Sequence, residues 1–107
     1  MAVAAVAALA VAANIFVCST SDDNMLCLLI NCRSLCNKLN EFNALLDSKK
    51  PAVVALTESW LNNTVSDAMI DTSNNYLIYR IDRPSSTRGG GGFAFWFLND
   101  FVVCRCL

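Results

Sequence analysis

Two side chains that carry oxygen ligands, Asn31 and Glu58, closely follow short apolar runs of the 107-residue chain. The runs, residues 26–30 and 52–56, have the continuous apolar character of strands buried on both faces of a sheet. If these strands are parallel, their carboxyl ends meet at one edge, about 4.8 Å apart as neighbours or about 10 Å apart with one strand between them. Either spacing lets an amide oxygen and a carboxylate approach one Mg²⁺ ion or one phosphate group.

Both residues also have a purely structural interpretation. Asn31 can shape the turn from a strand to a helix, and Glu58 can be a solvated carboxylate in a loop. The spacing of the two residues leaves both interpretations open.

The segment between the two runs has the pattern of a helix, which we expect over residues 35–47. Ser34 is suited to cap it, and Pro51 ends the segment after Lys49 and Lys50, whose charges suit a helix C-terminus. The apolar positions of one helix face are Leu35, Leu39, Phe42, Leu45 and Leu46. A strand, a helix and a strand with short connections predict a βαβ unit with parallel strands, and therefore the α/β class.

The remaining residues predict a second, antiparallel unit. Residues 62–75 are polar and predict a loop with a short helix at residues 68–70. Residues 76–79 and 93–97 read as strands, and the polar, glycine-rich connection between them favours a β-hairpin. A further strand is expected to begin at residues 101–103.

Three blocks of sequence stand in a recognisable order. The first contains Asn31-Cys32-Arg33-Ser34-Leu35 followed by Asn37-Lys38, and the second runs from Lys50 through Thr57-Glu58-Ser59-Trp60-Leu61. The third joins Tyr79-Arg80-Ile81-Asp82-Arg83 to Gly89–Gly92 and an apolar strand. Together they resemble the endonuclease domain of non-LTR retrotransposons, a branch of the endonuclease/exonuclease/phosphatase superfamily. Cys36 departs from the arginine that is common at the matching position of that family.

The resemblance implies a four-layer α/β sandwich that hydrolyses DNA phosphodiesters with Mg²⁺, of which this chain would be the incomplete N-terminal half. In that family the residue matching Glu58 is a metal ligand, and the residue matching Asn31 helps to hold the metal and the phosphate. These two are therefore the candidate catalytic and metal-binding residues. The family's Asp/Asn pair and its Asp-His pair belong to the second half, and this chain contains no histidine. We expect a fragment without catalytic activity.

Arginines near the glycine run are the candidate DNA contacts. Arg80, Arg83 and Arg88 form a local basic cluster that can touch a DNA backbone, although solvated loop arginines fit the same pattern. The glycine run leads into a strand and not into a helix N-terminus, which favours a flexible hairpin loop over a phosphate cradle. The net charge of -1 and the pI near 5.1 give no overall basic footprint. The resemblance implies DNA as the partner of the intact family. For this chain alone we expect weak DNA binding or none.

The first 24 residues are interpreted as an Ala/Val-rich leader and a polar linker, and residues 25–107 as the endonuclease-like domain. The apolar start has small residues suited to cleavage of a signal peptide, but no Lys or Arg precedes Arg33. We favour a nuclear or cytoplasmic protein, and secretion stays open if residues 1–18 act as a signal peptide.

Two rival classes remain open beside the endonuclease-like fragment. A small secreted, disulfide-linked protein is favoured by the leader, by six cysteines and by the glycosylation sequon at Asn62. A non-catalytic binding module would retain half of the fold for its surface. The content of 55% hydrophobic residues and the apolar strands lead us to expect poor folding and self-association through exposed strands.

Overall fold

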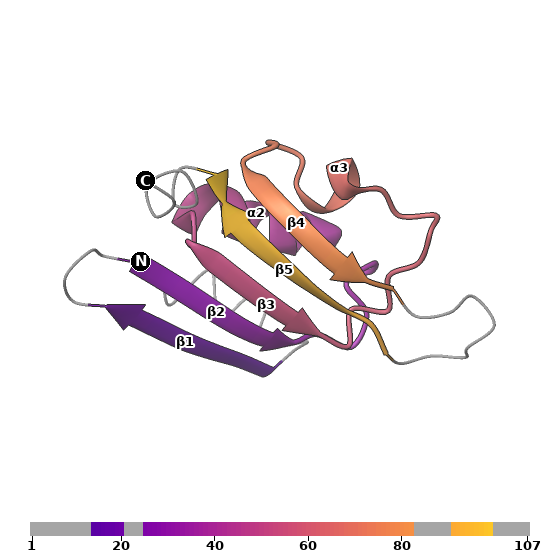
Figure 1. The fold of residues 1–107 in the computed structure, drawn as a ribbon, viewed down its shortest axis with the longest axis horizontal. Helices are drawn as coiled ribbons and strands as arrows, with labels where there is room; N and C mark the ends of the chain where they lie inside the picture. Colours follow the sequence, from indigo (N-terminus) through magenta and orange to yellow (C-terminus); the bar gives the residue numbers. More distant parts are fainter. Residues whose placement is uncertain (1–13, 21–24, 83–90, 100–107) are drawn as a thin grey trace.

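A mixed β-sheet with helices on one face forms the fold of this α/β chain (Figure 1). The computed structural model describes residues 14–20, 25–82 and 91–99. Within these ranges the strands and helices, in chain order, are β1 (Asn14–Thr20), β2 (Met25–Asn31), α2 (Leu39–Lys49), β3 (Val53–Thr57), α3 (Asp67–Ile70), β4 (Tyr76–Ile81) and β5 (Phe93–Leu98). The five strands lie side by side in the order β1-β2-β3-β5-β4. In the described part of the chain no helix is long and apolar enough to cross a membrane.

The predicted βαβ unit is confirmed. Strands β2 and β3 are parallel neighbours, with Leu28 opposite Val54 and Asn31 opposite Thr57. Both strands therefore end at the same edge of the sheet, as the apolar runs predicted. The helix between them crosses over the sheet and covers one of its faces.

The start of the helix differs from the prediction. Helix α2 begins at Leu39 and not at residue 35, and Ser34 is not its N-cap, because Ser34 lies in a loop with a φ of 80°. The C-terminal end agrees better with the sequence. Lys50 adopts a left-handed conformation (φ 45°), and its N–H donates to the carbonyl of Leu46 at 3.0 Å before Pro51 follows.

The antiparallel hairpin is also confirmed, since β4 pairs with β5 and β5 in turn pairs with β3. A short helix, α3, precedes β4 as predicted. The indole of Trp96 joins these parts: its ring lies 4.8 Å from that of Phe42 in α2, and its Nε1–H donates to the carbonyl of Ile70 at 3.1 Å.

The core lies between α2 and the inner face of the sheet. In strands β2, β3, β4 and β5, side chains from alternate positions point toward the helix, as the period of a strand requires. The strand and helix residues of this core are Leu28, Ile30, Phe42, Leu45, Leu46, Val54, Leu56, Ile70, Tyr76, Ala94 and Trp96.

The other positions of the strands form what we call the outer face, which lies away from α2. In Figure 1 this face is seen from the front, with α2 behind the sheet. The described side chains of the outer face are Cys27, Leu29, Asn31, Val53, Ala55, Thr57, Leu77, Tyr79, Ile81, Phe93, Phe95 and Phe97. Several of them are largely exposed.

Strand β1 is a departure from the expected leader and linker. Residues 14–20 pair antiparallel with β2 along its whole length, from Asn14 opposite Asn31 to Thr20 opposite Met25. The sheet thus begins before residue 25. Residues 14–17 end the apolar run that predicts a leader, and residues 19–20 begin the predicted linker, but apolar and β-branched residues are equally typical of a strand. Residues 1–13, 21–24 and the predicted strand at 101–103 lie outside the described residues.

Candidate functional site

The candidate site is the edge of the sheet where β2 and β3 end. Asn31 is the last residue of β2 and is exposed, and Glu58, which is half-buried, directly follows the last residue of β3. The register places Asn31 opposite Thr57. The structure thus brings Asn31 and Glu58 to adjacent strand ends, and their sharing of one ligand stays a prediction.

The backbone after β3 is fastened on both sides. On one side the N–H groups of the loop after β2 donate to it at 2.9 Å, from Cys32 to the carbonyl of Thr57 and from Ser34 to that of Glu58. On the other side the N–H of Trp60 donates to the carbonyl of Gly91 at 3.0 Å. The turn at Glu58 is therefore held between two segments that lie far apart in the sequence.

The carboxylate of Glu58 is itself oriented by this arrangement. Its Oε2 accepts a hydrogen bond of 2.9 Å from the N–H of Gly91. Gly91 has a φ of 86°, a conformation that glycine adopts without a steric penalty. The sequence predicts only a flexible hairpin loop for the glycine run. In the structure the carbonyls of Gly91 and Gly92 accept hydrogen bonds from the N–H groups of Trp60 and Ser59, next to Glu58. Gly89 and Gly90 lie outside the described residues.

Four non-glycine residues at this edge have left-handed backbone conformations. They are Arg33 (φ 50°), Ser34 (φ 80°), Glu58 (φ 54°) and Trp60 (φ 55°). A non-glycine residue in this region costs on the order of 1 kcal/mol or more, and such residues gather at functional sites when the surrounding structure fixes them. Here the hydrogen bonds across the turn supply that restraint.

Lys38 is the residue that organises the loop after β2. Its side chain is almost fully buried, and its Nζ donates to the carbonyls of Cys32, Arg33 and Ser34 at 2.8, 3.0 and 3.0 Å. The ammonium group thus closes the loop that follows Asn31. The sequence offered only one signal for this residue, its place in the Asn37-Lys38 block.

The same loop holds two cysteine thiols in different surroundings. Cys32 is buried and Cys36 is exposed, and neither forms a disulfide. Burial raises the pKa of the Cys32 thiol, the charge of Lys38 lowers it, and Cys36 raises it further. Cys32 therefore behaves as a small core residue rather than as a nucleophile.

The oxygen donors at this edge fit part of a Mg²⁺ site. Glu58 offers a carboxylate with one oxygen bound to an amide, and Asn31 offers an exposed amide oxygen. Across residues 14–20, 25–82 and 91–99, no three Asp, Glu, Cys or His side chains come together as a metal-binding group. Mg²⁺ commonly binds one or two carboxylates and completes its shell with water and phosphate, so these residues would hold the ion only in part.

Among the candidate DNA contacts the structure describes Arg80. Its guanidinium forms ion pairs with Asp67 at 3.0 Å and with Asp82 at 2.8 Å, and it donates to the carbonyl of Asn62. Its side chain is only 16% exposed. The hydrogen bond to Asp82 is the main cause that raises the pKa of Arg80, so its charge is already balanced by carboxylates. Arg83 and Arg88 lie outside the described residues.

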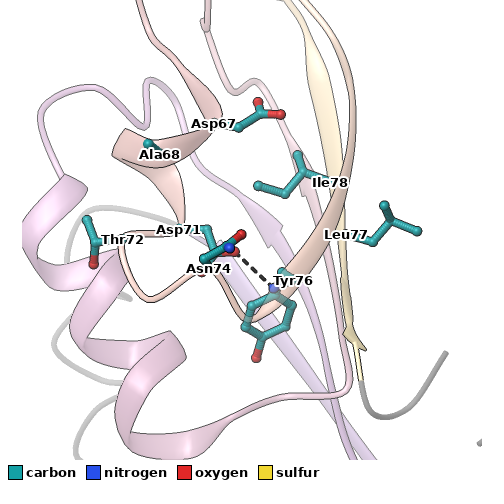
Figure 2. A pocket seen from close by; sticks show the side chains of 8 residues that line it. All are labelled: Asp67, Ala68, Asp71, Thr72, Asn74, Tyr76, Leu77 and Ile78. Carbon is teal, nitrogen blue, oxygen red and sulfur yellow. Dashed lines mark hydrogen bonds between the residues drawn. The ribbon is translucent and has the colours of Figure 1, made fainter. Parts of the chain in front are cut away.

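A cleft of about 300 Å³ lies elsewhere, between α3 and β4 (Figure 2). Its lining residues are Asp67, Ala68, Asp71, Thr72, Asn74, Tyr76, Leu77 and Ile78. The buried carboxylate of Asp71 accepts hydrogen bonds from the N–H groups of Asn75 and Tyr76 at 3.3 and 2.9 Å. This carboxylate thus fixes the entry into β4, and the cleft includes neither Asn31 nor Glu58.

Comparison of the chain with protein-family models, with curated proteins and with solved structures gave no match.

Proposed function

We propose that these residues are the N-terminal part of a Mg²⁺-dependent DNA endonuclease domain of the non-LTR retrotransposon type. In this proposal Asn31 and Glu58 contribute a subsite for the metal and for the scissile phosphate. The 107 residues alone do not catalyse cleavage, because they contain no histidine to serve as the family's general base.

The observation that carries the proposal is the fixed carboxylate of Glu58 beside the end of β2. The resemblance implies a metal ligand at this position, and the parallel register of β2 and β3 supports it. A solvated loop carboxylate needs neither a left-handed backbone nor an amide donor, whereas Glu58 has both. Strain that the fold maintains in this way is typical of sites that bind ligands.

The residues have distinct tasks in this proposal. The N–H of Gly91 holds Oε2 of Glu58, which leaves the other carboxylate oxygen for a cation. Asn31 supplies an amide oxygen or an amide N–H at the adjacent strand end, where a phosphate oxygen can accept a hydrogen bond. A bound Mg²⁺ ion would supply positive charge that stabilises the developing negative charge on a phosphodiester. Lys38 does not touch the ligand; it positions the loop after Asn31.

The test uses Mn²⁺ as a paramagnetic substitute for Mg²⁺ and follows amide signals by NMR. Substoichiometric Mn²⁺ is expected to broaden the amide signals of Asn31, Glu58 and Gly91 first. Excess Mg²⁺ should restore them by competition. Glu58→Gln should abolish the selective broadening, because the amide keeps an acceptor for Gly91 and lacks the negative charge.

Glu41→Gln is the matched control, since Glu41 is an exposed carboxylate in the first turn of α2. It should leave the broadening at residues 31, 58 and 91 unchanged. Broadening that centres elsewhere, or that persists in Glu58→Gln, would contradict a metal subsite at this edge.

A further inference from the structure

The outer face of the sheet carries no charged side chain among its described residues. Its largest exposed residues are Leu29 (50% exposed), Leu77 (41%), Tyr79 (58%), Ile81 (60%) and Phe93 (41%). A sheet with one face on the core usually has polar side chains on the face that meets water. Here every described outward position is apolar, apart from the uncharged polar groups of Asn31, Thr57 and Tyr79.

Aromatic rings form an ordered stripe along β5 on this face. The rings of Phe93 and Phe95 lie 6.0 Å apart and those of Phe95 and Phe97 lie 6.3 Å apart, all on β5. Tyr79 of the neighbouring strand packs edge-on against Phe97 at 5.9 Å. The stripe therefore has a defined shape before any partner arrives, which lowers the entropy lost on association.

The amount of apolar surface is large for a chain of this size. Five side chains, each about half exposed, leave on the order of 500 Å² uncovered, which equals the largest patch of a typical monomer. The half-buried Phe95 and Phe97 add to it. Two copies that pack these faces together would bury about 1,000 Å² in total, the lower limit of a specific interface.

We infer that the outer face is a dimer interface and that its occupant is the outer face of a second copy of this chain. Two like faces without charge do not repel each other, and a twofold axis makes each face its own complement. Sheets that pack face to face lie about 10 Å apart. Because α2 covers the opposite face, the dimer has a helix, two sheets and a helix as successive layers.

In the dimer the second copy takes the place that the resemblance gives to the second sheet of a four-layer sandwich. The dimer needs neither a metal nor DNA, so its failure leaves the proposed metal subsite untouched. It also differs from pairing at the sheet edges, where β1 and β4 lie. Pairing at an edge adds backbone hydrogen bonds and continues without limit, whereas packing of two outer faces stops at two copies.

The experiment is size-exclusion chromatography with light scattering on the full chain, over about 1 to 100 µM protein, a range that brackets the micromolar affinity expected for an interface of this size. The wild-type chain should change from a monomer to a dimer. Leu29→Glu places a charge on the outer face at β2, an inner strand of the sheet, and should weaken the dimer by on the order of a hundredfold. Met69→Glu is the matched control, because Met69 is 42% exposed on α3, away from the outer face, and should leave the dimer intact.

Circular dichroism shows whether each variant keeps its fold, and Phe93→Lys, on the inner strand β5, replaces Leu29→Glu if that variant unfolds. A wild-type monomer at 100 µM would overturn the inference. So would assemblies larger than a dimer that both outer-face variants leave unchanged, because these would arise from edge pairing.

Discussion

Replacing Lys38 by Met tests the claim that a buried ammonium group builds the loop next to Asn31. The methionine keeps most of the apolar stem and removes the charge. Three carbonyl oxygens, those of Cys32, Arg33 and Ser34, then lose a donor at 2.8–3.0 Å. A hydrogen bond to a charged group contributes about 1.5–3 kcal/mol, and the three share one ammonium whose desolvation offsets part of the gain. The expected loss in the free energy of unfolding is therefore about 3 kcal/mol.

Urea unfolding measures this loss, followed by circular dichroism and by the fluorescence of the buried Trp96. The protein is kept near 1 µM so that association does not contribute to the apparent stability. With a slope of about 1–1.5 kcal/mol per M for a small domain, the urea midpoint should fall by roughly 2 M. If Lys38→Met is already unfolded in water, an osmolyte such as TMAO restores a measurable transition.

Lys49→Met is the control, because Lys49 lies in the last turn of α2 and its side chain forms no hydrogen bond or ion pair with the described residues. It should cost less than about 1 kcal/mol through the helix dipole alone. The assigned role of Lys38 would be refuted if the two variants lost the same free energy of unfolding. It would also be refuted if Lys38→Met lost less than about 1 kcal/mol, since one hydrogen bond to a charged group contributes more than that.

Three further outcomes follow from other contacts. Burial, followed by the charges of Asp71 and Asp47, raises the pKa of Tyr76, so the fold favours the neutral phenol. This contribution to stability is complete below about 10, the pKa of tyrosine in the unfolded chain, and is lost as the pH rises above that value. Tyr76→Phe should remove this alkaline loss in pH-dependent melting and cost about 1 kcal/mol at pH 7, because the hydroxyl donates to the carbonyl of Pro51 at 2.6 Å; an unchanged alkaline limit would contradict this role. Plasmid DNA should remain intact with the purified chain and Mg²⁺, and Glu58→Ala should change nothing, whereas nicking that disappears in Glu58→Ala would disprove the absence of activity. Arg80→Met should leave DNA binding in a filter assay unchanged but lower the melting temperature, because Arg80 pairs with Asp67 and Asp82; reduced DNA binding with an unchanged melting temperature would show the opposite role.

The sequence predicted the βαβ unit and the hairpin because apolar periodicity records burial directly. The expectation that residues 26–30 and 52–56 are buried on both faces is wrong. Their alternate positions are buried and face Phe42, Leu45 and Leu46 of the helix, whereas Leu29 on the outer face is 50% exposed. The same periodicity placed the helix start too early. Leu35 is fully buried, but it belongs to the loop and not to the helix, so burial alone does not separate a helical turn from a loop that packs on the core.

The candidate site was predicted only in its outline. The strand ends that carry Asn31 and Glu58 follow from the βαβ rule. The bond from Gly91 to Glu58 joins residues 33 positions apart, and no local pattern records it. The bonds from Lys38 reach only four to six positions back, but they belong to a loop where the sequence predicted the first turn of a helix. The paired state of Arg80 likewise depends on Asp67, which is thirteen positions away in the sequence.

Anomalous scattering from a Mn²⁺-soaked crystal of the chain tests the proposed subsite most directly. We expect a peak at the edge where β2 and β3 end, about 2.0–2.2 Å from a carboxylate oxygen of Glu58. Water should complete the shell, and the side-chain oxygen of Asn31 should contact the ion directly or through water. The same soak of Glu58→Gln crystals should give no peak there. A peak at another carboxylate with none at Glu58, or no bound ion at saturating Mn²⁺, would contradict the assignment of this edge as a metal subsite.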